Sequence, residues 1–299
     1  MVISTHDLNF YFGDQLVVKD LSLQVPEGSI FGFLGPNGAG KTTTIKLLLS
    51  LLKIQEGSIQ IFGEELQSNR IKILRQVGSL IEQPAIYHHL TGKENLINRA
   101  RLLEIPVSRA NDMLDLVQLG QAAHKKAGNY SLGMKQRLGI GLAMLGDPKL
   151  LVLDEPTNGL DPNGIIEVRE LLVKLVKEQG KTVFVSSHLL AEVERMATHV
   201  GIINHGAMLF QGSIAELEGI SQPMVQVETD NTVDAANFLK KNGREISQVT
   251  DHFITLPFVS KDDMAAINAN LHNNGHKIYS INKVQKDLEQ LFLNITKQA

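Results

Sequence analysis

A glycine-rich loop runs Gly35-Pro36-Asn37-Gly38-Ala39-Gly40-Lys41-Thr42-Thr43. It matches the pattern G-x-x-x-x-G-K-[ST]. The preceding residues 29–34 predict a short buried strand, and residues 42–52 carry apolar side chains at helical spacing. In such a loop between a strand and a helix, the glycines let consecutive backbone N–H groups point inward at a triphosphate, and the following helix adds the positive end of its dipole. All nine residues are therefore candidates to hold a nucleoside triphosphate such as ATP.

Two side chains of this loop have more specific predicted roles. Lys41 is expected to reach the β- and γ-phosphates, which makes it a candidate catalytic residue. Thr42 opens the following helix beneath the phosphates, so its hydroxyl is expected to ligate Mg²⁺.

A second buried strand is predicted at residues 150–153, and it ends in Asp154 and Glu155. One carboxylate can hold the Mg²⁺ shell while the next polarises a water for in-line attack. A third strand at residues 182–186 is followed by His188, which can hydrogen-bond a γ-phosphate oxygen. The alternative for His188 is a capped core histidine.

Three weaker signals each leave an alternative open. Phe12 precedes a turn at Gly13, where its ring can stack on a base or belong to the core.

Glu82 and Gln83 follow a predicted strand at residues 77–81, so either can face the metal or an attacking water, or lie in a solvated loop. Ser131, two residues before Gly133, can mark a second anion site or simply cap a helix predicted at residues 137–145.

Composition narrows the class of protein. The 299 residues are 43% hydrophobic, enough for a sizeable core, and the net charge of −3 gives no overall positive field for nucleic acid. The absence of cysteine removes disulfides and thiolate chemistry and is compatible with a reducing compartment. Residues 1–7 lack the pattern of a secretory signal, and the most apolar run, residues 45–54, is too short to span a bilayer.

The order of predicted elements suggests two domains. Residues 1–28 alternate short strands with turns, which predicts a small antiparallel layer. Residues 84–145 are predicted to form a mostly helical subdomain, with Thr91 and Ser108 as helix caps. We expect residues 1–218 to form an α/β nucleotide-binding domain, and residues 219–299 a small α+β domain with no chemical motif of its own.

Four motifs in this order resemble those of the ATP-binding cassette (ABC) family. They are the loop GPNGAGKTT, the signature-like YSLGMKQ at residues 130–136, the acidic strand LLVLDEPTNGLDP at residues 150–162, and Ser187-His188. The resemblance covers about residues 1–218 and implies the ABC ATPase form of the P-loop NTPase fold, with an antiparallel β layer and a helical subdomain.

The resemblance also implies a role for each matching residue. Phe12 would stack on adenine, Asp154 would hold Mg²⁺ through water, Glu155 would be the general base and His188 would fix the γ-phosphate. Ser131 and Gly133 would bind the ATP held by a second copy of the chain in a head-to-tail dimer.

Two departures from the family pattern are informative. The signature usually has Gly-Gly-Gln after its serine, whereas this chain has Leu132-Gly133-Met134. The alignment also puts Glu82 at the usual Q-loop glutamine, where a carboxylate can still ligate Mg²⁺; a shift by one would put Gln83 there. Such an "E-loop" is similar to bacterial exporters that protect producers from lantibiotics, other bacteriocins and bacitracin, and the tail at residues 287–294 resembles the ending of drug-exporting ABC ATPases.

The implied function is the ATP-hydrolysing subunit of an exporter of peptide antibiotics, for self-protection or resistance. Its implied partners are a second copy of the chain and membrane-spanning permease subunits; no nucleic-acid partner is implied. The permeases would hold the chain at the cytoplasmic face of the membrane. One alternative is a soluble ABC ATPase of ribosomes or DNA, although such relatives carry two cassettes or a long coiled-coil insert, which this sequence lacks. The others are a general drug-exporter ATPase and a nucleotide sensor that scarcely hydrolyses.

Overall fold

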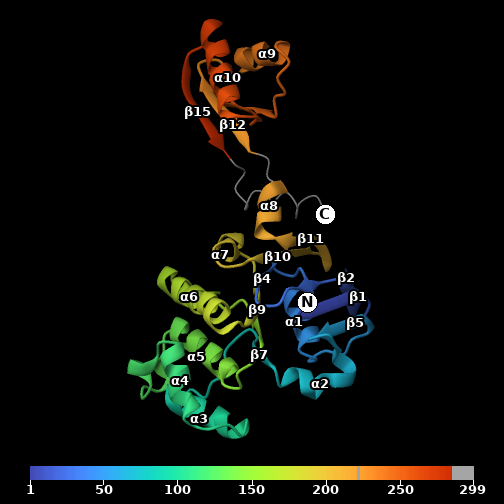
Figure 1. The fold of residues 1–299 in the computed structure, drawn as a ribbon, viewed down its shortest axis with the longest axis vertical. Helices are drawn as coiled ribbons and strands as arrows, with labels where there is room; N and C mark the ends of the chain where they lie inside the picture. The colour runs from blue at the N-terminus through green and yellow to red at the C-terminus, as the bar shows by residue number, and fades with distance from the viewer. Residues whose placement is uncertain (221–222, 285–299) are drawn as a thin grey trace. The chain divides into compact units, whose positions relative to one another are not determined.

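The computed structural model describes residues 1–220 and 223–284, which divide into two compact units. The first comprises Met1–Ile214, and the second begins at Ala215. Each unit is described by itself (Figure 1). The expected domain boundary after residue 218 falls within α8 (Ile214–Ile220).

A six-stranded sheet forms the centre of the first unit, in the order β11-β10-β4-β9-β8-β7. Its strands are β4 (Ile30–Leu34), β7 (Val77–Leu80), β8 (Leu150–Asp154), β9 (Thr182–Ser187), β10 (His199–Asn204) and β11 (Ala207–Ser213). All neighbours are parallel except β11, which pairs antiparallel with β10. Strands β4, β8 and β9 are buried at every position. Because β4, β9, β8 and β7 are adjacent and parallel, their carboxyl ends open at one edge of the sheet.

An antiparallel layer lies beside this sheet, as the alternating runs of residues 1–28 predicted. It has the order β2-β1-β5-β6, with β3 also paired to β1. Its strands are β1 (Ile3–Phe12), β2 (Gln15–Leu21), β3 (Gln24–Val25), β5 (Glu56–Ile61) and β6 (Glu64–Glu65). Residues of β1, β2 and β5 share a core cluster with Phe31 and Phe33 of β4. The layer is thereby packed against the strand that leads into the glycine-rich loop.

Four helices of the first unit are α1 (Lys41–Leu48), α2 (Leu66–Leu74), α6 (Pro162–Gln179) and α7 (Leu190–Glu194). Helix α6 has two well-defined ends: the Asp161 side chain accepts a hydrogen bond from the Gly164 N–H, and Gly180 ends the helix at φ 62°. Helix α7 was not expected, because its five residues are too few to give a clear helical period.

The predicted helical subdomain contains α3 (Gly92–Leu102), α4 (Arg109–Leu116) and α5 (Leu132–Met144), which lie together in Figure 1. Thr91 caps α3 in a reciprocal capping box with Glu94. The predicted cap at Ser108 is wrong, because Ser108 has helical dihedrals and its side chain makes no capping bond. Helix α5 begins at Leu132 rather than at residue 137, because Ser131 accepts from the Met134 N–H. Residues 84–91 lie outside any helix.

The second unit is the expected small α+β fold. Its elements are β12 (Met224–Thr229), α9 (Thr232–Lys241), β13 (Gln248–Val249), β14 (Phe253–Pro257), α10 (Lys261–Asn273) and β15 (Ile278–Val284). The antiparallel sheet has the order β13-β14-β12-β15. Val225, Val227, Ile254 and Leu256 form its core with residues of α9 and α10. The tail singled out at residues 287–294 lies outside the described residues.

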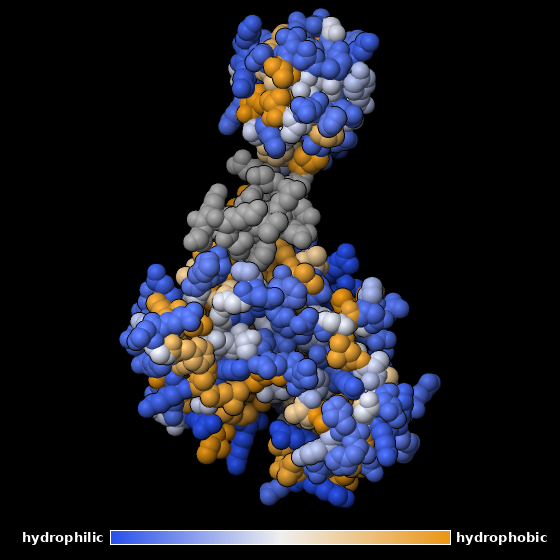
Figure 2. All heavy atoms as spheres, turned by 180° about the vertical axis from the view of Figure 1, so that it is seen from behind, coloured by the Kyte–Doolittle hydropathy of each residue, from blue (hydrophilic) through white to orange (hydrophobic). Residues whose placement is uncertain are grey.

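Apolar side chains reach the surface of the first unit among mostly polar ones, as the orange patches of Figure 2 show. Large exposed examples are Leu51, Ile71, Tyr87 and Leu102. Within residues 1–220 and 223–284, no helix is both long and apolar enough to cross a membrane.

Candidate active site

The glycine-rich loop joins β4 to α1 and needs glycine at two crowded positions. Gly40 has φ 104°, and a Cβ there would lie 2.8 Å from the Val17 carbonyl oxygen. A Cβ at Gly35 would lie 2.4 Å from the Ile203 carbonyl oxygen. Both positions exclude larger residues because the clashing atoms belong to backbone. The loop is therefore held in one shape by its neighbours, with the N-terminus of α1 at its end.

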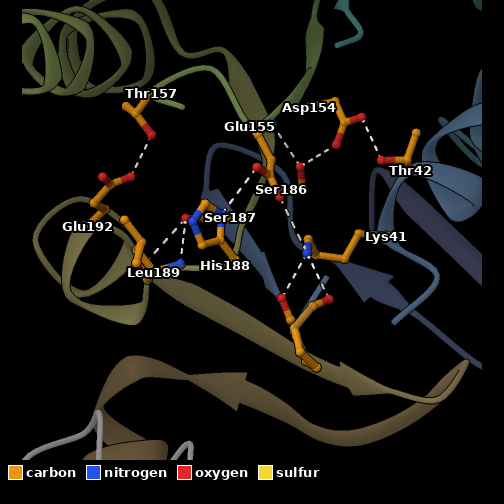
Figure 3. Close-up of polar contacts among 12 residues, drawn as sticks. Lys41, Thr42, Asp154, Glu155, Thr157, Ser186, Ser187, His188, Leu189 and Glu192 are labelled. Carbon is orange, nitrogen blue, oxygen red and sulfur yellow. Dashed lines mark hydrogen bonds and ion pairs between the residues drawn. The ribbon is translucent and has the colours of Figure 1, made fainter. Parts of the chain in front are cut away.

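Lys41 turns its ammonium group back over this loop. Its side chain is 5% exposed, and Nζ donates to the carbonyl oxygens of Gly35 at 2.8 Å and Pro36 at 3.2 Å. Nζ also lies 3.4 Å from Oε1 of Glu155, which follows β8 (Figure 3). The structure thus brings together the loop lysine and the second acid of the pair.

Asp154, at the end of β8, is 2% exposed and has both carboxylate oxygens occupied. Thr42 donates to Oδ2 at 2.8 Å, and Ser186 donates to Oδ1 at 2.6 Å. Ser186 is directly opposite Asp154 because β8 and β9 pair in parallel register. Sequence reasoning missed this serine, although a polar residue at the end of a buried strand was a signal for it.

Glu155 is fixed at three atoms. Its N–H donates to Ser186 Oγ at 2.9 Å, Oε2 lies 3.1 Å from Nδ1 of His188, and Oε1 faces Lys41. Its φ of 45° belongs to the left-handed region, which is uncommon for residues other than glycine. Strained backbone of this kind clusters at functional sites, where the surroundings impose it. The structure therefore brings the side chains of Lys41, Glu155 and His188 together.

A small cavity opens beside Glu155 and His188. Asn158 and Gly159, which lie in the turn after β8, and Glu192 of α7 contribute to its lining. The carboxylate of Glu155 therefore borders open space, while Lys41 and His188 each contact one of its oxygens.

Phe12 ends β1 and is 52% exposed, so the core alternative is wrong for this ring. Its edge packs against the buried Phe10, with the two ring centroids 4.9 Å apart. An aromatic ring supported by a buried neighbour and open to solvent can stack on a flat base.

The signature-like segment, residues 130–136, begins at a buried tyrosine whose hydroxyl is hydrogen-bonded. Tyr130 is 4% exposed, and its hydroxyl donates to the Ala122 carbonyl oxygen at 2.7 Å. Burial raises the pKa of this phenol, which keeps it a donor. The next residue, Ser131, is exposed and caps α5, with Gly133 in the first turn of the helix. Ser131 and Gly133 thus lie at an accessible helix N-terminus.

Glu82 follows β7, the strand that pairs with β8. Its carboxylate is 63% exposed and makes an ion pair with Lys46 of α1, with 2.9 Å between Oε1 and Nζ. The next residue, Gln83, is also exposed. In this structure, Glu82 therefore contacts a lysine rather than the Thr42–Asp154 pair.

The residues present are compatible with Mg²⁺. A hydroxyl and a carboxylate meet at Thr42 and Asp154, and such oxygen donors suit a hard cation. The described part of the chain holds no cluster of three or more His, Cys, Asp or Glu residues arranged for a metal.

The fold and this edge of the sheet define a P-loop protein that binds and hydrolyses a nucleoside triphosphate. A family model described as "ABC transporter" matches residues 18–158. The chain is 50% identical over 209 residues to "Bacitracin transport ATP-binding protein BcrA" of Bacillus licheniformis, which covers 70% of this chain and 68% of that protein. It is 38% identical to "Lantibiotic transport ATP-binding protein SrtF" of Streptococcus pyogenes, over 70% of this chain and 90% of the relative.

Among solved structures, "cbiO1 from clostridium perfringens: Part of the ABC transporter complex cbiONQ" matches with a TM-score of 0.68 and 25% identity. The match covers 73% of this chain and 90% of the other. The chain therefore belongs to the family of ABC transporter ATP-binding proteins. These comparisons confirm the predicted fold, the family and an ATPase activity that is coupled to transport.

Proposed function

We propose that the edge of the sheet formed by β4, β9 and β8 is the hydrolytic site, with the residue roles expected from the sequence. Lys41 neutralises charge on the β- and γ-phosphates, and backbone N–H groups of the glycine-rich loop surround them. The observation that carries this proposal is the 3.4 Å approach of Lys41 Nζ to Glu155 Oε1. At this separation a single γ-phosphate would lie within reach of both side chains, which supports the two proposed roles.

Glu155 is the general base in this proposal. Its two neighbours orient one carboxylate oxygen each: Lys41 Nζ lies 3.4 Å from Oε1, and His188 Nδ1 lies 3.1 Å from Oε2. Once ATP binds, Lys41 exchanges its loop carbonyls for phosphate oxygens, and Glu155 takes the proton of the attacking water. His188 then donates a hydrogen bond to the γ-phosphate from the neighbouring strand end.

Mg²⁺ belongs to the same proposal, with Thr42 and Asp154 as the residues that hold it and Glu82 as a further candidate ligand. When bound, the cation neutralises charge that develops on the phosphates. The Ser186 hydroxyl donates to Oδ1 of Asp154 and orients the carboxylate, so that Oδ2 faces Thr42.

Phe12 is proposed to stack on adenine. We expect Phe12→Ala to weaken ATP binding roughly tenfold, because base stacking on an aromatic ring is worth about 1–3 kcal/mol. Phe12→Tyr should retain the parent affinity, since it keeps the ring. Titration with a fluorescent ATP analogue measures both, and an unchanged affinity in Phe12→Ala would remove the adenine assignment.

The proposed working unit is a head-to-tail dimer in which Ser131 and Gly133 contact the ATP of the other copy. The exposure of Ser131 and the place of both residues at the N-terminus of α5 support this, because a helix N-terminus attracts phosphate. Ser131 would then have two tasks, as a helix cap and as a phosphate ligand.

Two substitutions separate these tasks. Ser131→Ala should cost about 1 kcal/mol of stability through loss of the cap and should also weaken ATP-induced dimerisation. Ser131→Asp keeps a capping oxygen, so stability should be preserved, but its negative charge repels phosphate and should abolish dimerisation. The measurements are thermal unfolding and light scattering with ATP, both on a Glu155→Gln background.

The matched control is Thr91→Ala, which removes the cap of α3 and should lower stability by a similar amount while dimerisation persists. A dimer that forms normally with Ser131→Asp would rule out the phosphate role.

We propose that residues 1–218 act as the ATPase domain, with residues 84–145 as the subdomain that passes its motion to membrane-spanning permease subunits. The exposed apolar side chains Tyr87 and Leu102 of this segment support a docking role. Attachment to permeases would hold the chain at the inner face of the membrane. Residues 219–299 would form an accessory domain, and the net charge of −3 gives no reason to expect a nucleic-acid partner.

The proposed cargo is a peptide antibiotic of the bacitracin or lantibiotic type, which is expelled to protect the cell. The relatives that support it are named as bacitracin and lantibiotic transport proteins. Cells that express the chain together with its permease subunits should survive higher concentrations of bacitracin or a lantibiotic than cells with the Glu155→Gln chain. Equal survival with the two chains would argue against export of these cargoes.

A further inference from the structure

Lys46 occupies a particular place on α1. It lies four residues after Thr42, so the two side chains project from the same face of the helix, one turn apart. Thr42 donates its hydroxyl to Asp154, whereas Lys46 pairs with Glu82. One face of α1 therefore contacts two carboxylates: that of Asp154 at the end of β8 and that of Glu82 just after β7.

The two acids come from neighbouring strands. Glu82 follows β7, Asp154 ends β8, and these strands pair in parallel with Leu80 opposite Leu153. The Lys46–Glu82 pair is thus adjacent, along both the helix and the sheet, to the Thr42–Asp154 pair. A carboxylate held in this way is close to the proposed cation site while it is charge-balanced by a lysine.

We propose that Lys46 is a positioning residue that holds the Glu82 carboxylate until the cation arrives, so that Lys46 and Mg²⁺ compete for it. This inference rests on the proposed role of Glu82 toward Mg²⁺. A glutamine in place of Glu82 has no net charge, so the competition requires the acid found in this chain.

The exposure of the pair suits an exchange of partners. Lys46 is 36% exposed and Glu82 is 63% exposed. Solvent weakens such an ion pair, which keeps it easy to break. Glu82 also has φ 56°, which lies in the left-handed region that residues other than glycine seldom adopt.

The test uses a double-mutant cycle of Lys46→Met and Glu82→Gln in the full chain. The probe is Mn²⁺, whose affinity for protein loaded with a non-hydrolysable ATP analogue is measured by electron paramagnetic resonance. Lys46→Met should raise Mn²⁺ affinity about two- to fivefold, the range for an exposed ion pair, because Glu82 is released. In the Glu82→Gln background the same change should have a clearly smaller effect.

Two controls refine the reading. Lys46→Arg retains a cation and should behave as the parent. Lys53→Met removes an exposed positive charge after α1 and should leave Mn²⁺ affinity unchanged. If Lys46→Met changes the affinity by the same factor with and without Glu82, the effect is that of a lost charge, and the competition is refuted.

A metal-free measurement separates this inference from the proposed function. Thermal unfolding of the four proteins of the cycle, without nucleotide, should show a favourable coupling between Lys46 and Glu82. Additivity would overturn the pairing itself. Binding of ATP by the parent in the presence of Mg²⁺ is tested in parallel, and its failure would count against the proposed function while leaving the coupling result intact.

Discussion

Glu155→Gln is expected to slow ATP hydrolysis by about 10² to 10⁴-fold, the range for loss of a general base, while ATP still binds. The amide has the size of the carboxylate, so the loop and Lys41 keep their positions. It cannot accept the proton of the attacking water, which leaves the chemical step without its base. Single-turnover hydrolysis and equilibrium ATP binding measure the two effects separately.

The control for Glu155→Gln is Glu170→Gln, which neutralises an exposed acid on α6 and should leave turnover unchanged. If the Glu155→Gln protein hydrolyses ATP at the parent rate, another group activates the water. Loss of ATP binding in this variant would instead mean that Glu155 serves to shape the loop.

Lys41→Met is expected to weaken ATP binding roughly a hundredfold. Truncation of one partner of a buried, hydrogen-bonded charge pair costs about 2–5 kcal/mol, and the ammonium group of Lys41 is buried at the centre of the loop. Methionine matches the length of lysine but cannot donate to a phosphate oxygen. Calorimetric titration with ATP measures the change.

Lys53→Met, which alters an exposed lysine beyond α1, provides the matched comparison and should bind ATP like the parent. An affinity for ATP within twofold of the parent in Lys41→Met would contradict the phosphate role of this lysine.

Much of the fold was predictable because its buried strands are unusually clear. Residues 150–153 and 182–186 are short apolar runs followed by polar residues, and the structure has them as β8 and β9, buried throughout. Helix α6 was predictable at both ends because Asp161 and Gly180 are strong end signals. The pairing of residues 56–61 with β1 was not predictable, since it joins segments separated by the whole of α1.

The residues of the candidate site likewise fall into those that the sequence predicts and those that only the tertiary structure brings in. Lys41, Thr42, Asp154 and Glu155 belong to local motifs whose spacing carries their chemistry. Ser186 and Lys46 carry no such motif. Their contacts with Asp154 and Glu82 depend on the register of β8 and β9 and on the face of α1, which are tertiary features.

The most direct measurement is a structure of the Glu155→Gln protein crystallised with ATP and Mg²⁺. The γ-phosphate should lie within hydrogen-bond distance of Lys41 Nζ, with a water between it and the amide that replaces the Glu155 carboxylate. A triphosphate bound elsewhere, or a γ-phosphate that contacts Lys41 while the side chain at position 155 faces away from it, would contradict hydrolysis at this edge of the sheet.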